Sequence, residues 1–190
     1  DNEITAITIG RNGRKTTFGC GEYQEHQENV QYYKCADESA LLLAFLEVWN
    51  GSLYSPDVVT GWNIEFFDIP YIINRIRRVL GEDAALRLSP WGILKDYRVL
   101  VRGREQLAYT PVGVAVLDYM QLYKKFTYVT RESYKLDHIA LVELGEQKLD
   151  YSQYENLDDL RLKNFQMYME YNIHDVELVE KLEDKLKLIE

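Results

Sequence analysis

The sequence predicts an α/β fold in which a mixed sheet is flanked by helices. Three observations carry this prediction: strand-like segments open the chain, strand and helix patterns then alternate, and helical patterns fill the last third. Hairpins supply antiparallel strands, whereas strands joined through helices pair in parallel, so both kinds of pairing are expected. A chain of 190 residues suits one domain with a buried core, and a single domain over 1–190 is expected.

The first third of the chain is expected to form three strands and a helix. Alternating apolar residues indicate the strands, and Asn12-Gly13 is typical of the turn of a β-hairpin. Asp37 is expected to cap the helix, whose apolar residues recur at helical spacing, and Asn50-Gly51 to end it. The expected strands are at 4–9, 16–18 and 30–35.

The middle of the chain alternates between strands and helices. A short apolar strand at 57–62 leads into a helix whose isoleucines recur at helical spacing and which Gly81 ends. A second hairpin is expected around Arg102-Gly103-Arg104, and a buried strand at 114–117 runs into another helix. Further helices are expected from a cap at Ser133 to Gly145, and from about Leu157 to the end of the chain.

The net charge of −9 limits the partners that the chain can have. Phosphate contacts usually come from Lys and Arg, so nucleic-acid binding needs acidic residues that hold divalent metal ions, or a larger parent protein with a basic groove. The apolar runs are far shorter than the roughly 18 residues of a membrane span, and no membrane partner is expected. Cys20 and Cys35 form neither a disulfide framework nor a zinc site, which makes a reducing cytoplasm the expected location.

Asp68 is the first carboxylate whose context stands out. It follows a buried strand at the start of a helix, in the segment Gly61-Trp62-Asn63 through Phe67-Asp68-Ile69-Pro70-Tyr71. On local grounds it is a helix N-cap before Pro70. Because ligands of α/β sheets bind beyond the carboxyl ends of strands, an acid at this place among aromatic residues can instead hold a metal ion.

Asp175 is the second such carboxylate. It lies in a helix four residues after Tyr171, so the two side chains share one helix face. The pair is either a solvated carboxylate beside a packing tyrosine, or a metal-bound carboxylate with a phenol that holds a water. The neighbouring His174 points to a different face and is interpreted as structural. Asp118, at the end of the strand at 114–117, is interpreted as a helix cap in preference to an acid at the rim of a site.

In these segments the sequence resembles the proofreading exonuclease domain of family B DNA polymerases, of the type found in large tailed phages. Gly61 to Tyr71 is similar to the second exonuclease motif of that family, and Tyr171-Asn172-Ile173-His174-Asp175 to its third, the Tyr-x-x-x-Asp form. The segments between them are similar in order and spacing: Leu88-Ser89-Pro90, Val116-Leu117-Asp118-Tyr119, Leu122-Tyr123-Lys124-Lys125-Phe126 and Ser133-Tyr134-Lys135-Leu136-Asp137.

The resemblance implies a ribonuclease-H-like fold with an inserted β-hairpin. It also implies a site in which four acidic ligands hold two divalent ions, Mg²⁺ or Mn²⁺, for hydrolysis of the 3′-terminal phosphodiester. Asp68 and Asp175 match two of the metal ligands, and Tyr171 matches the tyrosine that orients the attacking water. The DNA-binding positions that it implies are Asn63, Phe67, Arg102 and Arg104.

The first motif of the family, Asp-x-Glu on the first strand, has no clear match. It should lie shortly before the segment from Asn2 to Thr8, which itself resembles the second strand of the family. Asp1-Asn2-Glu3 has the right letters but precedes a strand. The chain is therefore expected to be an N-terminally truncated piece of a longer polymerase, and to be inactive on its own because half of the acidic ligands are missing.

The expected function is that of a 3′→5′ exonuclease domain that proofreads during DNA replication. Its expected partners are single-stranded DNA 3′ ends and the rest of the polymerase chain, in the cytoplasm of the host if the protein is phage-encoded. The alternatives are a catalytically dead nuclease-like scaffold or binding domain, and a free-standing exonuclease. Retention of Asp68, Tyr171 and Asp175 favours an active parent protein.

Overall fold

The computed structural model describes residues 2–52, 54–101 and 103–190, and the chain falls into two compact units. Unit 1 holds the N-terminal residues up to Ile4 together with Glu38–Phe126, and unit 2 holds Thr5–Asp37 together with Thr127–Glu190. Both units combine strands with helices, so the mixed α/β class is confirmed. The ribonuclease-H-like arrangement and the single domain over 1–190 stay predictions.

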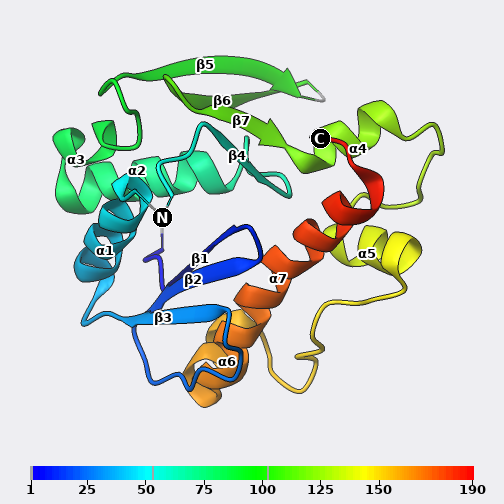
Figure 1. Ribbon diagram of the computed structural model, residues 1–190, viewed down its shortest axis with the longest axis horizontal. Coiled ribbons are helices and arrows are strands. Elements are labelled where there is room, and N and C mark those ends of the chain that lie inside the picture. Colours follow the sequence, from blue (N-terminus) through cyan, green and yellow to red (C-terminus); the bar gives the residue numbers. More distant parts are fainter. Residues whose placement is uncertain (1, 53, 102) are drawn as a thin grey trace. The chain divides into compact units, whose positions relative to one another are not determined.

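The described residues of unit 1 form two separate pairs of strands and four helices (Figure 1). One pair is parallel and joins segments that are far apart in the sequence, whereas the other is a long antiparallel hairpin. The elements are α1 (Glu38–Asn50), β4 (Val58–Gly61), α2 (Asp68–Leu80), α3 (Glu82–Leu86), β5 (Leu94–Val101), β6 (Arg104–Pro111), β7 (Ala115–Asp118) and α4 (Tyr119–Phe126). β4 pairs with β7, and β5 with β6.

Unit 2 contains a three-stranded mixed sheet and three helices. In Figure 1 the blue strands lie side by side in the order β1-β2-β3, with β1 antiparallel and β3 parallel to β2. The longest helix, α7, packs on β1 and β2, and α5 and α6 pack on α7. The elements are β1 (Ala6–Arg11), β2 (Arg14–Gly19), β3 (Val30–Lys34), α5 (Leu136–Leu144), α6 (Leu157–Lys163) and α7 (Phe165–Leu186).

Apolar side chains at helical spacing explain why these helices form and which faces they bury. α2 buries Ile69, Ile73 and Ile76 along one stripe, as the isoleucine pattern predicts. In unit 2 the inward face of α7 carries Met169, Ile173, Leu178, Val179 and Leu182. Among the described residues, no helix is long and apolar enough to cross a membrane.

Some details of the helices differ from the sequence-based expectations. The C-terminal helical region is two helices, because Asn164 breaks it and accepts a hydrogen bond from the N–H of Met167 to cap α7. Lys135, and not Ser133, stands at the N-cap position of α5. The short helix α3 was not predicted, because it has only five residues and no apolar stripe of its own.

A buried ion pair joins α1 to α2 in unit 1. The guanidinium of Arg75 on α2 donates from Nε to Oε1 of Glu38 at 2.8 Å and also bonds to Oε2, and the two side chains are only 7% and 9% exposed. The same carboxylate accepts the backbone N–H of Ile4 at 2.7 Å. Burial alone would raise the pKa of Glu38, but the hydrogen bonds from Arg75 and Ile4 outweigh it and lower that pKa.

Glu38→Gln is expected to lower the free energy of unfolding at neutral pH by about 3 kcal/mol, because it leaves the buried guanidinium of Arg75 without a counter-charge. The folded pKa of Glu38 lies below its ordinary value of 4.5, so this stabilisation is present above that value and is lost as the pH falls through the folded pKa. Urea unfolding of the wild type and the variant, at neutral pH and below the folded pKa, measures the change.

The matched control is Glu82→Gln. It breaks a similar but more exposed ion pair with Arg77, which lies on α2 like Arg75. Its expected cost is roughly 0.5 kcal/mol or less. Equal costs for the two variants, or a cost of Glu38→Gln that persists at acid pH, would contradict the prediction.

Candidate functional site

A compact turn joins β4 to α2 in unit 1 and carries the first of the expected site segments. A Cβ at Gly61 would lie 2.4 Å from Cγ2 of Ile64, so Ile64 can fold back only over a glycine. Asn63 has a φ of 63°, in the left-handed region that asparagine tolerates better than most residues. Its carbonyl accepts the N–H of Phe67 at 3.2 Å. The turn therefore leads directly into α2.

Phe67 and Asp68 stand side by side where this turn enters α2. Phe67 is at the N-cap position, is 62% exposed, and stacks on Tyr71 with 6.0 Å between ring centroids. Asp68 is the first residue of the helix and is exposed, so the interpretation of Asp68 as the N-cap is wrong. The first turn of a helix favours a carboxylate because the helix end carries partial positive charge. The segment thus offers an aromatic surface and a carboxylate at one helix end.

Asp118 lies at the carboxyl end of β7, in the register position beside Gly61 on β4. Its Oδ1 accepts the N–H groups of Met120 at 3.0 Å and Gln121 at 3.3 Å. This is the geometry of a helix N-cap for α4, and the interpretation of Asp118 as a cap is confirmed.

The hairpin of β5 and β6 is connected to the same turn. Tyr97 on β5 donates its hydroxyl to Oε1 of Glu65 at 2.7 Å, and burial together with this carboxylate raises the pKa of Tyr97. Arg98 pairs with Glu105 across the hairpin at 3.2 Å, in an exposed contact. Two arginines of the hairpin are expected to contact phosphates. Arg102 and the side chain of Arg104 lie outside the described residues.

In unit 2, α7 presents Tyr171 and Asp175 one turn apart, and the structure adds Lys148 to them. The Nζ of Lys148 lies 2.6 Å from Oδ2 of Asp175 and 3.4 Å from the hydroxyl of Tyr171. It also sits 5.1 Å from the centre of the Tyr171 ring, which packs edge-on against Tyr151. A carboxylate, a phenol and an ammonium group therefore converge on one face of α7.

The second oxygen of Asp175 is electrostatically unusual. Oδ1 is buried, and among the described residues it has no hydrogen-bond partner. Burial raises the pKa of Asp175, and the ammonium of Lys148 offsets only part of that effect. For Lys148, burial alone would lower the pKa, but the charge of Asp175 outweighs it and raises that pKa. The pKa of Asp175 is raised because its carboxylate is desolvated and has one oxygen without a hydrogen bond. The pKa of Lys148 is raised because the same carboxylate stabilises its protonated form.

The loop that carries Lys148 is held in place by two neighbours. Its backbone N–H donates to Oδ1 of Asp137 at 2.9 Å, and Nε2 of His174 lies 3.1 Å from the carbonyl oxygen of Gln147. His174 is thus structural, as the sequence indicates, and its role is to anchor this loop. Sequence reasoning missed Lys148, because a single lysine in a polar loop 27 residues before its partner carries no local signal.

The assignment of Asp68 and Asp175 as metal ligands stays a prediction. The described residues contain no group of three or more His, Cys, Asp or Glu side chains that could hold a metal ion, and Asp68 and Asp175 belong to different units. The buried Oδ1 of Asp175 does fit such an ion, because a hard divalent cation takes carboxylate oxygens as ligands and would satisfy an otherwise unpaired atom. The exposed carboxylate of Asp68 has the same chemistry.

Comparison with protein families gives a match over most of the chain. A family model described as DNA polymerase family B, exonuclease domain, matches residues 3–139. The matched range contains Asn63, Phe67 and Asp68, whereas Tyr171 and Asp175 lie beyond it.

Individual relatives extend this similarity toward the C-terminus. The chain is 39% identical over 164 residues to the DNA-directed DNA polymerase of Escherichia phage RB69 and 37% identical over 164 residues to that of Enterobacteria phage T4. These alignments cover 85% and 86% of the chain but 18% of each polymerase. The DNA polymerase catalytic subunit of Elephantid herpesvirus 1 is 32% identical over 83% of the chain and 15% of its own length.

Proposed function

Because the chain belongs to the exonuclease domain family of family B DNA polymerases, we propose that it removes nucleotides from DNA 3′ ends as the 3′→5′ proofreading domain of a longer DNA-directed DNA polymerase. The chain spans 18% of the length of the phage polymerases that it matches, which leaves room for a polymerase domain in the parent protein. The observation that carries the proposal is the half-satisfied carboxylate of Asp175 beside Tyr171 and Lys148.

In this proposal Asp175 and Asp68 are the carboxylates that hold two divalent ions, Mg²⁺ or Mn²⁺, together with acids of the first motif. When bound, such ions supply positive charge at the scissile phosphate and lower the pKa of a bound water. The net charge of −9 argues against DNA binding, because the chain has no excess of Lys and Arg for the phosphates. Bound divalent ions answer this objection, because they supply the positive charge in place of those side chains.

The remaining residues of the site orient the reactants. Tyr171 lies one turn before Asp175, so its hydroxyl can hold the attacking water by one hydrogen bond. The ammonium group of Lys148 contacts both the Tyr171 hydroxyl and Oδ2 of Asp175, and so holds these two groups close together. Phe67, exposed at the start of α2, offers a ring on which an unpaired terminal base can stack, with Asn63 in the same turn.

A catalytically inactive scaffold is the alternative, and the environment of Asp175 argues against it. A buried carboxylate oxygen without a partner costs free energy, which a scaffold could avoid with an apolar residue at this position. Retention of the costly residue is what a catalytic site requires.

The proposal predicts that the full-length protein degrades an unpaired 3′ end faster than a paired one. An unpaired end need not be melted before it enters the site, and melting costs a few kcal/mol. Digestion of 5′-labelled DNA in Mg²⁺, with a single strand, a duplex and a duplex with a mismatched 3′ end, measures the three rates. The expected order is single strand, mismatched end, paired end.

Three outcomes would contradict the proposal. Early release of the labelled 5′-terminal nucleotide would show that the enzyme degrades DNA from the 5′ end. Cleavage of circular single-stranded DNA would show that it is an endonuclease. The absence of any degradation in Mg²⁺ or Mn²⁺ would favour the scaffold.

A further inference from the structure

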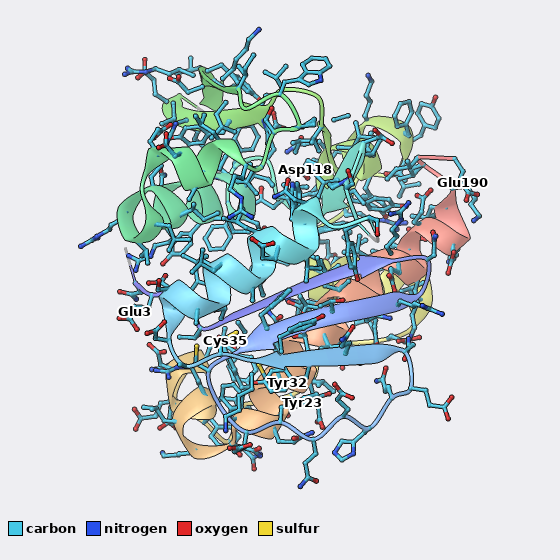
Figure 2. All side chains as sticks on the ribbon, turned by 60° about the vertical axis from the view of Figure 1, so that its left-hand side comes forward. Glu3, Tyr23, Tyr32, Cys35, Asp118 and Glu190 are labelled. Carbon is cyan, nitrogen blue, oxygen red and sulfur yellow. The ribbon has the colours of Figure 1, made fainter. Side chains whose placement is uncertain are left out.

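The buried carboxylate of Asp118 makes more hydrogen bonds than a helix cap needs. It belongs to unit 1 and is only 4% exposed, and Figure 2 labels its position. Besides the two amides of α4, Oδ1 accepts the N–H of Asn63 at 3.2 Å, and Oδ2 accepts the N–H of Glu65 at 3.2 Å. One carboxylate therefore ties the start of α4 to the turn between β4 and α2.

The parallel pairing of β4 with β7 creates this contact. Gly61 and Asp118 are the last register pair of the two strands, so the turn that leaves β4 passes directly over the carboxylate. Asn63 adopts a left-handed conformation, which asparagine tolerates better than most residues but which still costs free energy compared with glycine. The hydrogen bonds to Asp118 hold the turn on either side of Ile64.

The constraint extends to the residues proposed to bind DNA and metal. The carbonyl of Asn63 accepts the N–H of Phe67, and the carbonyl of Ile64 accepts the N–H of Ile69 at 3.0 Å. Asp68 stands between these two anchored residues. A displacement of the turn would therefore displace both the ring of Phe67 and the carboxylate of Asp68.

We propose that Asp118 is a positioning residue for the exonuclease reaction, which fixes the turn that presents Phe67 and Asp68. This inference rests on the proposed exonuclease function. Asp118 touches neither substrate nor metal in this role and acts only through the backbone of Asn63 and Glu65. Residues that orient ligands of a metal site from behind typically contribute about 10-fold to 100-fold to metal affinity or activity.

Two substitutions separate this role from the capping of α4. Serine is as good an N-cap as aspartate, so Asp118→Ser keeps the cap but is too short to reach the amides of Asn63 and Glu65 as well. Asp118→Asn keeps one oxygen for the cap but turns an N–H₂ group toward the N–H of Glu65, which has no acceptor in that place. Both variants should preserve α4, while Asp118→Ser releases the turn at Asn63 and Glu65 and Asp118→Asn releases it at Glu65.

The experiment uses the full-length protein and measures exonuclease rates on a 5′-labelled single strand across Mn²⁺ concentrations. Asp118→Ser and Asp118→Asn are expected to raise the Mn²⁺ concentration for half-maximal rate and to lower kcat, each by about tenfold. Hydrogen exchange of the peptide over 62–68, measured without metal or DNA, is expected to speed up by at least about tenfold, while the peptide over 119–126, which covers α4, stays unchanged.

The matched control is Ser89→Ala. Ser89 is equally buried in unit 1 and also ties two backbone segments, through a hydrogen bond to the carbonyl of Val112 at 2.6 Å and one from the N–H of Trp91. Both of these hydrogen bonds join segments other than the turn, so this variant should lose stability without a change in Mn²⁺ dependence.

Three results would overturn the inference. Unchanged exchange over 62–68 would show that Asp118 does not fix the turn, and unchanged Mn²⁺ dependence with faster exchange would show that the turn need not be fixed. An equal change in Ser89→Ala would reduce the effect to general destabilisation. A wild-type protein that degrades no DNA would instead overturn the proposed function, whatever the exchange of the turn.

Discussion

In the full-length protein, Asp175→Ala is expected to slow the removal of 3′-terminal nucleotides by at least about 10²-fold, and Asp68→Ala to do the same. Each change removes a proposed metal ligand, and alanine offers no oxygen in its place. At Asp175 it also removes the group that holds the ammonium of Lys148. Single-turnover digestion of labelled single-stranded DNA in Mg²⁺ measures the rates.

Tyr171→Phe provides the graded comparison. It removes one hydrogen bond to the attacking water and leaves both carboxylates in place, so its effect should be smaller than that of either aspartate variant. His174→Ala should also have a small effect, because it weakens an anchor of the Lys148 loop without touching the site itself.

Matched controls exist on α7 itself and on α3, the helix that follows α2. Asp184→Ala removes an exposed carboxylate from α7, and Asp83→Ala removes one from the first turn of α3. Both should leave the rate within about twofold of the wild type, as surface changes usually do. If Asp175→Ala behaved like Asp184→Ala, while His174→Ala abolished activity, the site would be built around an imidazole and the proposed mechanism would be wrong.

A double variant separates catalysis from folding. Replacement of a desolvated ion pair by apolar residues of similar volume is often neutral or stabilising. Lys148→Met with Asp175→Leu is therefore expected to unfold at or above the wild-type temperature while losing exonuclease activity. A lower unfolding temperature, with activity lost in proportion to the folded fraction, would show that the pair serves the fold alone.

The second large effect concerns the 190-residue chain by itself, which is expected to trim single-stranded DNA at least about 10³-fold more slowly than the full-length protein. Two-metal hydrolysis needs both ions clamped at about 4 Å, and this chain supplies Asp68 and Asp175 out of the four carboxylates that the family implies. Digestion of the same labelled strand by both proteins, in Mg²⁺ and in Mn²⁺, measures the ratio.

Circular dichroism and a cooperative unfolding transition of the 190-residue chain provide the control, because an unfolded chain would be inactive for another reason. Brisk trimming by a folded chain would contradict the prediction and would indicate that Glu3 or another acid completes the site. Glu3→Gln would then identify the residue.

Local signals in the sequence determined most of the secondary structure and the position of the candidate motifs. Asn12-Gly13 marks the hairpin of β1 and β2, and the isoleucines at helical spacing mark α2. The four-residue spacing of Tyr171 and Asp175 places both on one face of α7 through helical periodicity alone. Asn164 is the exception, because its side chain caps a new helix inside a region whose apolar pattern continues on both sides.

The tertiary structure alone decided which distant groups complete each half of the candidate site. Lys148 reaches Asp175 across 27 positions of sequence, and Asp118 reaches Asn63 across 55. Neither contact follows from periodicity, because periodicity reports only which face of an element is buried. The contacts arise where a loop docks on α7 and where β4 pairs with β7, and both depend on the packing of segments that are remote in the chain.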